Sequence, residues 1–240
     1  LSVSDTTGNG SSTDTRNPPS QIANNTLLIY SGSMTESTTG TLTVSLPQGI
    51  STASAVTLTV NVSPAFPVGY MVNGSLVSNT FQVFIPSNTH SVTYSLAAAD
   101  DHRIGNLSFS LSGTSSSSDY VVNGGSLTVS DTTGSGSSVD PENPGGPAIA
   151  NNTVIIYSGS VSESLSRTLT VGLPQGISTT TGITVTITPI PVFPAGYTVN
   201  GAAASNTFKV FIPSNSNLVT YSLSTADDSQ LNNLTISLSG

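Results

Sequence analysis

Residues 81–96 read FQVFIPSNTHSVTYSL, and residues 208–223 read FKVFIPSNSNLVTYSL. In both segments, two stretches of alternating apolar and polar residues flank the sequence Pro-Ser-Asn. Alternation with a period of two is typical of a strand that has one face on a core and the other in water. Proline, serine and asparagine between two such stretches favour a tight turn. The sequence therefore predicts a strand–turn–strand hairpin in each half of the chain.

The hairpin is part of a longer repeat. Residues 22–26, IANNT, return as residues 149–153, and 149 minus 22 gives an offset of 127. Residues 46–52, LPQGIST, return as residues 173–179 with the same offset. This period is well above the roughly 20–50 residues of solenoid repeats, so each repeat is expected to bury its own core. An enzyme rarely needs a second copy of itself in one chain, whereas a fibre, a stalk or a multivalent binder does.

Strand-like alternation continues through most of each repeat. In the first repeat it also covers residues 41–46, 56–62 and 107–111, and in the second repeat residues 168–173, 183–187 and 234–238. Threonine and valine dominate these segments, which agrees with strand packing, and no amphipathic helix is evident. About seven short strands per repeat are typical of a β-sandwich. The sequence predicts an all-β protein with two tandem Ig-like antiparallel β-sandwiches joined by a linker rich in Pro, Gly and Ser.

The repeat also sets the expected domain boundaries. Residues 1–21 combine a strand that matches the end of a preceding repeat with a linker, and residues 22–134 form the first sandwich. Residues 135–150 form a second linker, and residues 151–240 form the second sandwich without a counterpart of the last strand of the first. Proline fixes φ and favours an extended chain, so we expect semi-rigid spacers. The alternative is a flexible tether.

The opening strand is expected to take part in assembly. Leu1–Asp5 reads LSVSD and matches LTVSD at residues 127–131, which we expect to close the first sandwich. The second sandwich would then have an open strand edge, and open edges invite pairing. Leu1–Asp5 of another copy fits that edge, which predicts head-to-tail strand donation between further copies of the repeat in a longer array. The alternative is that both segments are the first strands of their own sandwiches and nothing is exchanged.

Composition favours a protein outside the cell. The chain has no Cys and no Trp, and only 7% of its residues are charged, as is common in surface proteins rich in Ser, Thr, Asn and Gly. Four basic residues against twelve acidic ones give a net charge of −8, which argues against binding to nucleic acid. No apolar run approaches the length of a membrane span. We expect an extracellular or cell-surface location, without membrane insertion in this segment.

Several features follow one another in a fixed order within one repeat. They are an early acid at Glu36, the strand–turn–strand at 81–96, the acidic pair Asp100-Asp101, a strand at 107–112 that ends in Leu-Ser, and a last strand that closes on Asp131. This order resembles the Calx-β family of Ig-like β-sandwich repeats in bacterial surface adhesins. Two features depart from the family pattern, because His102-Arg103 follows the acidic pair in place of further acids and Asp131 is not followed by a second Asp.

The resemblance implies calcium binding at one end of the sandwich. The positions that match the acidic sites of the family are Glu36, Asp100, Asp101 and Asp131, and in the second repeat Glu163, Asp227 and Asp228. These are seven of the twelve acids of the chain, and gathering like charges is unfavourable without a cation. Calcium takes six to eight oxygen ligands, several of them carboxylates. The alternative is that these acids are turn and cap residues in exposed loops.

Catalysis has little support in the sequence. Neither His90 nor His102 recurs, because Asn217 and Ser229 stand at the matching positions of the second repeat. The chain has no Cys nucleophile, no Gly-x-Ser-x-Gly elbow and no phosphate loop. We therefore expect that the protein is not an enzyme.

The expected function is structural. The chain is predicted to be a repeat segment of a long extracellular surface protein, as an adhesin stalk, a spacer or a filament-forming repeat rigidified by calcium. The alternative is a β-sandwich module that binds carbohydrate or another ligand, with Tyr70 and Tyr197 as candidate sugar platforms. A binder would expose aromatic side chains on one face, whereas a spacer would bury them and order its linkers.

Overall fold

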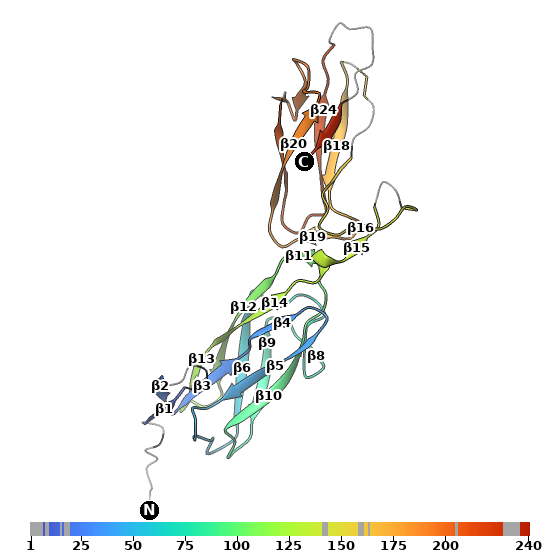
Figure 1. Ribbon diagram of the computed structural model, residues 1–240. Coiled ribbons are helices and arrows are strands. Elements are labelled where there is room, and N and C mark those ends of the chain that lie inside the picture. Colours follow the sequence, from blue (N-terminus) through green and yellow to red (C-terminus); the bar gives the residue numbers. More distant parts are fainter. Residues whose placement is uncertain are drawn as a thin grey trace, which may run out of the picture. The chain divides into compact units, whose positions relative to one another are not determined.

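The computed structural model describes residues 7, 10–14, 16, 20–140, 144–157, 161–162, 164–204, 206–227 and 236–240. The chain divides into two compact units, both built from strands (Figure 1). The first unit runs up to Asp101 and includes Asn106–Asp131, and the second consists of His102–Gly105 and Thr132–Gly240. No α-helix occurs in the described ranges, and no helix there has the length and hydropathy to cross a membrane. The predicted all-β class is confirmed.

The first unit is an Ig-like sandwich of two sheets. The strands of one sheet are β3 (Thr26–Tyr30), β5 (Thr39–Ser45), β7 (Met71–Val72), β8 (Ser75–Leu76), β10 (Ser91–Ala97) and β13 (Val121–Asn123). Those of the other sheet are β4 (Ser33–Thr35), β6 (Val56–Ser63), β9 (Thr80–Ile85), β12 (Leu107–Ser115) and β14 (Gly125–Ser130). The first sheet has the order β13-β3-β5-β10-β7-β8, and the second has the order β4-β14-β12-β6-β9. Every strand predicted for this repeat is present.

The predicted hairpin at residues 81–96 is wrong in its pairing. β9 pairs with β6 and β10 pairs with β5, so the turn at Pro86 joins two opposite sheets. The apolar faces of both strands still point to one core, where Val83 and Leu96 are buried. Alternation predicts which face of a strand is buried, but it does not predict which other strand pairs with it. The second repeat has the same arch, because its two strands also lie in different sheets.

The core of the first unit contains three aromatic rings in contact, with Phe66 and Tyr70 stacked and Phe66 and Phe109 edge to face. Phe66 lies 4.9 Å from Tyr70 and 4.8 Å from Phe109, measured between ring centroids. Tyr70 is fully buried, and its counterpart Tyr197 in the second unit is 6% exposed and stacks on Phe193 at 5.3 Å. Buried rings cannot present a face to a sugar. The expectation of sugar platforms at these two tyrosines is therefore wrong.

The last strand of the first unit changes sheet within two residues. β13 pairs in parallel with β3 in the first sheet, and β14 pairs with β12 and β4 in the second. Gly124 and Gly125 lie at this change, where an added Cβ would collide with the carbonyl oxygens of Leu111 and Ile29, respectively. These oxygens belong to strand backbone and cannot move aside, so the crossing requires glycine. β14 closes the first unit, as predicted for residues 127–131.

The second unit repeats this plan with fewer strands among its described residues. Its larger sheet has the order β17-β18-β24-β21-β22, and β23-β20-β25 form a smaller one. The bounds are β17 (Ile155–Tyr157), β18 (Ser166–Gly172), β20 (Ile183–Ile190), β21 (Thr198–Val199), β22 (Ala202–Ala203), β23 (Phe208–Ile212), β24 (Leu218–Ser224) and β25 (Ser237–Ser239). A further pair, β11 (Arg103–Ile104) and β19 (Ser178–Thr179), is parallel. The core divides into two clusters, around Ile187 and around Phe193.

Each unit begins with a short antiparallel pair in a segment that the sequence assigned to a linker. In the first unit β1 (Ser11–Thr13) pairs with β2 (Gln21–Ala23), and in the second β15 (Ser137–Ser138) pairs with β16 (Ile149–Ala150). Buried Asn24 donates through Nδ2 to the carbonyl oxygen of Thr7 at 2.7 Å, and buried Asn151 donates in the same way to Thr133 at 2.7 Å. The described parts of both segments are thus folded onto their units by the same contacts.

A second contact holds each pair to the turn at the Pro-Gln-Gly motif. The N–H of Gln48 donates to the carbonyl oxygen of Thr13 at 3.2 Å, and the N–H of Gln175 donates to Val139 at 3.1 Å. Because the asparagine contact and the glutamine contact occur in both repeats, the folded start of each unit is a property of the repeat itself. Leu1–Asp5, for which we predicted donation to another copy, lies outside the described residues.

Tyrosine hydroxyls cap the outer strand of the smaller sheet in both units. β9 is the last strand of its sheet, and the N–H of Phe84 donates to the hydroxyl oxygen of Tyr94 at 2.8 Å. In the second unit the N–H of Phe211 donates to Tyr221 at 2.9 Å. A proline without an N–H follows both strands. Edge groups satisfied in this way are less available for pairing with another chain.

Replacing Tyr94 by phenylalanine is expected to lower the free energy of unfolding of the first unit by about 1 kcal/mol, because one hydrogen bond is lost while the ring stays in place. Amide hydrogen exchange at Phe84 should become faster. The matched change Tyr221→Phe should have the same effect on Phe211 and none on Phe84. Unchanged exchange at Phe84 would contradict the capping role.

Candidate metal centre

The pairing of β5 with β10 brings the matched acids of the first repeat together. These strands are antiparallel, with Ala97 opposite Thr39. Glu36 comes three residues before Thr39 and Asp100 three residues after Ala97, so both lie beyond the same end of the pair. The N–H of Ala98 donates to the carbonyl oxygen of Thr38 at 3.2 Å and extends the ladder toward the acids.

The turn after β4 fixes the backbone of Glu36. Thr35 is opposite Ser130 of β14, and the N–H of Glu36 donates to the carbonyl oxygen of Ser130 at 3.1 Å. Ser37 then adopts a left-handed conformation with φ of 58°, and the hydroxyl of Thr38 donates to the carbonyl oxygen of Thr35 at 2.5 Å. The Glu36 side chain is only 2% exposed. The interpretation of this acid as an exposed loop residue is therefore wrong.

Three carboxylates form one group at this end of the sandwich. Ligand oxygens of Glu36, Asp100 and Asp101 all lie within 4.8 Å of one another. Glu36 is buried and the two aspartates are half-buried. Like charges at this separation repel, more strongly where water is excluded, and a divalent cation converts the repulsion into attraction. Three carboxylate oxygens match part of the all-oxygen shell that calcium prefers.

Asp131 reaches the same end of the sandwich but is outside the group of three. It follows β14 directly, and its N–H donates to Oδ1 of Asn106 at 2.9 Å. In the second unit Asp227 is exposed, whereas Glu163 and Asp228 lie outside the described residues. The structure thus brings together three of the four acids that the resemblance implied for the first repeat. The register of β5 against β10 places Glu36 and the acidic pair at the same end of the sandwich.

His90 has a structural contact that sequence reasoning missed. Its Nδ1 lies 2.8 Å from the carbonyl oxygen of Ile50, so a proton on Nδ1 makes this a hydrogen bond. In the second unit Asn217 donates through Nδ2 to the carbonyl oxygen of Ile177 at 2.6 Å. Histidine and asparagine thus hold the same turn in the two repeats. Both side chains can donate a hydrogen bond, which is the one signal in the sequence that could have predicted this role.

The outer face of the first sheet carries a shallow pocket beside this contact. Its volume is about 330 Å³, and it is lined by Tyr30, Thr43, Ser45, His90 and Ser91. The second repeat has Tyr157, Thr170, Gly172, Asn217 and Leu218 at these positions. Two of the five polar side chains, those of Ser45 and Ser91, are therefore missing in the second repeat, and no pattern in the sequence indicates the pocket.

Comparison with known proteins leaves the family of the chain open. No family model and no curated protein sequence matches it. Among solved structures, the chain is similar to the type II cohesin dyad from the adaptor ScaA scaffoldin of Acetivibrio cellulolyticus. The identity is 10%, the match covers 84% of this chain and 77% of the dyad, and the TM-score is 0.20. A likeness of this size supports no conclusion about function, and the β-sandwich fold rests on the strand pairings described above.

Proposed function

We propose that the chain is a non-catalytic structural segment of a long extracellular surface protein built from Calx-β-like repeats, as an adhesin stalk, a spacer or a filament-forming repeat. The observation that supports this best is that the described parts of both linker segments are folded onto their units. Asn24 and Asn151 hold the two segments to their units by equivalent hydrogen bonds. A spacer gains from linkers held in this way, because every held residue removes freedom between successive modules. The buried ring of Tyr70 also favours a spacer over a sugar binder.

Calcium is the proposed ligand of the group formed by Glu36, Asp100 and Asp101. The support is the distance among the ligand oxygens and the burial of Glu36, which places a carboxylate where water alone solvates it poorly. The remaining ligands of a calcium ion are backbone carbonyls and water in many proteins. A bound cation would join the turn after β4 to the segment after β10 and so stiffen this end of the sandwich.

The reading frame that encodes the chain is the direct test of the structural role. We expect it to contain further repeats at a spacing close to 127 residues, an export signal and a terminal surface anchor. A reading frame without an export signal would contradict the proposal. So would a frame in which the two repeats are attached to a catalytic domain and no further repeats occur.

Further copies of the repeat are the proposed partners. In the first unit β12 lies between β6 and β14, whereas β25 of the second unit pairs with β20 and with no other described strand. A strand like β14 fits beside β25, and Leu1–Asp5 matches residues 127–131 at four of five positions. We propose that such a strand comes from a neighbouring copy, either along one chain or between chains.

Deleting Leu1–Thr7 tests donation between chains. If Leu1–Asp5 pairs with another copy, the deletion should abolish concentration-dependent association in sedimentation experiments. The free energy of unfolding of the first unit should change little, apart from the lost contact of Asn24 with Thr7. Loss of several kcal/mol from the first unit would instead mean that the segment is one of its own core strands.

The pocket on the first sheet supports a second candidate function, the binding of a small polar ligand. Its lining carries hydroxyl groups and one imidazole but no carboxylate or ammonium group, which suits a neutral, hydroxyl-rich molecule. Chemical-shift titration with neutral mono- and disaccharides tests this. The control is the variant that takes the second repeat's residues, Ser45→Gly, His90→Asn and Ser91→Leu together. Shifts that are equal in both proteins, or absent from both, would reject the pocket as a binding site.

A further inference from the structure

β3, near the beginning of the first unit, and β13, near its end, run side by side in the same direction. Val121 of β13 is opposite Thr26 of β3, and Asn123 is opposite Leu28, with both strands running toward higher numbers. The pairing continues in the second sheet, where Thr128 of β14 is opposite Ser33 of β4. One parallel seam thus joins the beginning and the end of the sandwich through both sheets.

The direction of these strands decides how a pulling force acts on them. A force on the two ends of the unit pulls β3 and β4 toward their N-termini and pulls β13 and β14 toward their C-termini. Because the strands are parallel, these pulls act along the strand axes in opposite senses, so the seam is loaded in shear. All its hydrogen bonds then resist together. An antiparallel terminal pair would instead open one hydrogen bond at a time.

Three backbone and two side-chain hydrogen bonds supplement the strand pairing of the seam. Beyond the strand pairing itself, five bonds cross it: Val121 N–H to the Asn25 carbonyl (3.0 Å), Asn25 Nδ2 to the Asp119 carbonyl (3.0 Å), Ser31 hydroxyl to the Ser126 carbonyl (2.6 Å), Thr128 N–H to the Gly32 carbonyl (3.0 Å) and Glu36 N–H to the Ser130 carbonyl (3.1 Å). They are spread along the whole seam. No single break therefore releases the end of the unit.

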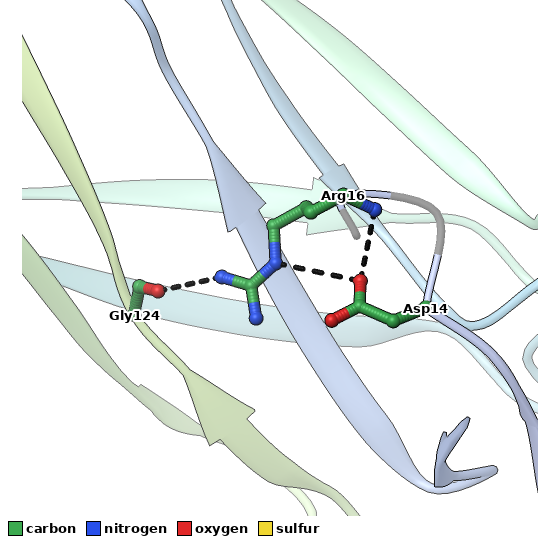
Figure 2. A network of polar contacts seen from close by, with 3 residues as sticks. All are labelled: Asp14, Arg16 and Gly124. Carbon is green, nitrogen blue, oxygen red and sulfur yellow. Dashed lines mark hydrogen bonds and ion pairs between the residues drawn. The ribbon is translucent and has the colours of Figure 1, made fainter. Parts of the chain in front are cut away.

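Arg16 connects the segment before β3 to the same seam. Its Nη1 donates to the carbonyl oxygen of Gly124 at 2.7 Å, at the point where the last strand changes sheet (Figure 2). Asp14 holds the guanidinium from the other side, with Nε and Oδ1 3.6 Å apart, and also accepts the backbone N–H of Arg16 at 2.8 Å. The Arg16 guanidinium carbon lies 5.7 Å from the centre of the Tyr30 ring. The bond from Arg16 to Gly124 connects two parts of the chain that are 108 residues apart in the sequence.

We propose that the first unit is a tension-bearing module, with the parallel seam as its mechanical clamp and Arg16 as an accessory fastening. The inference gives the proposed stalk a specific task, but the clamp itself does not depend on calcium, on strand donation or on an extracellular location. Unfolding under force follows the barrier to unfolding rather than the equilibrium stability. The lifetime of the unit under load should therefore depend on the seam more than on other contacts of equal strength.

Single-molecule pulling on the whole chain tests the clamp. The chain has no Cys, so a cysteine added at each end gives unique attachment points. Ser31→Ala removes the hydrogen bond to Ser126. Under a constant end-to-end force, the lifetime of the folded first unit should be about fivefold shorter in this variant than in the parent chain. Tyr94→Phe removes a hydrogen bond outside the seam, and the lifetime of this control should change less than twofold. Arg16→Gln should act like Ser31→Ala, because the bond to Gly124 is lost.

The direction of pulling separates a clamp from general stability. Leu76 is 69% exposed on β8, the outer strand of the first sheet, so Leu76→Cys provides an alternative attachment point. Force between residue 76 and the C-terminal end pulls β8 away from the edge of its sheet. The seam is then no longer loaded in shear. The first unit should then unfold at least tenfold faster at the same force. Equal lifetimes in the two directions, or equal effects of Ser31→Ala and Tyr94→Phe, would overturn the proposal even if the chain is an extracellular stalk.

Discussion

Replacing Gly124 by alanine should lower the free energy of unfolding of the first unit by about 3 kcal/mol, because its Cβ would collide with the carbonyl oxygen of Leu111. The oxygen is part of β12, which is paired on both sides, so the collision cannot be relieved by a side-chain rotation. Denaturant unfolding followed by the amide signals of the first unit measures the change. The second unit, followed in the same experiment, should keep its midpoint.

Gly32→Ala is the matched control. Gly32 lies between β3 and β4, where the first strand changes sheet, and an added Cβ meets nothing within 4 Å. The free energy of unfolding should stay within about 0.5 kcal/mol of the parent value or rise slightly, because alanine restricts the unfolded chain. An equal loss for Gly124→Ala and Gly32→Ala would mean that backbone flexibility, rather than the close approach to Leu111, explains both glycines.

Calcium should raise the melting temperature of the first unit, and the rise should disappear when Glu36 is replaced by glutamine. Binding to the folded state alone stabilises by mass action, by about 4 kcal/mol when free calcium is 1,000-fold above the dissociation constant. Without calcium the order should reverse. Glu36→Gln removes one of three repelling carboxylates, so the variant should melt at or above the parent temperature in excess chelator.

The neighbouring acids provide the controls. Asp100→Asn combined with Asp101→Asn should abolish the calcium effect, as Glu36→Gln does. Asp131→Asn should leave most of it, because Asp131 is outside the group of three. Asp119→Asn, in the turn before β13, should leave all of it. Identical melting curves in chelator and in millimolar calcium would show that the three carboxylates do not bind calcium.

The strands could be predicted from the sequence better than their partners. Alternation located β5, β6, β9, β10 and β12, since burial of one face has a direct signature in the sequence. It could not show that β9 and β10 belong to opposite sheets, because both arrangements bury the same residues. For a related reason, the sequence did not predict β3. Thr26–Ile29 is buried at every position, so it has no alternation to detect.

The linker segments and the site show the same limit. Serine, glycine and proline before each repeat predicted a spacer, but the contact of Asn24 with Thr7 depends on a side chain buried against residues distant in the sequence. For the acids, the family resemblance gave four candidates in the first repeat. The register of β5 against β10 then decided that Glu36, Asp100 and Asp101 meet, and no local pattern carries that register.

The folded segment at the start of each unit has a consequence for how a single unit can be moved into another protein. Because Asn24 depends on Thr7, and Asn151 on Thr133, a unit cut out to begin at Ile22 or Ile149 would leave a buried asparagine without its acceptor. Cuts just before Thr7 and Thr133 keep both partners in one piece. A unit transplanted on its own should therefore begin at Thr7 or Thr133, which is earlier than the visible repeat of IANNT.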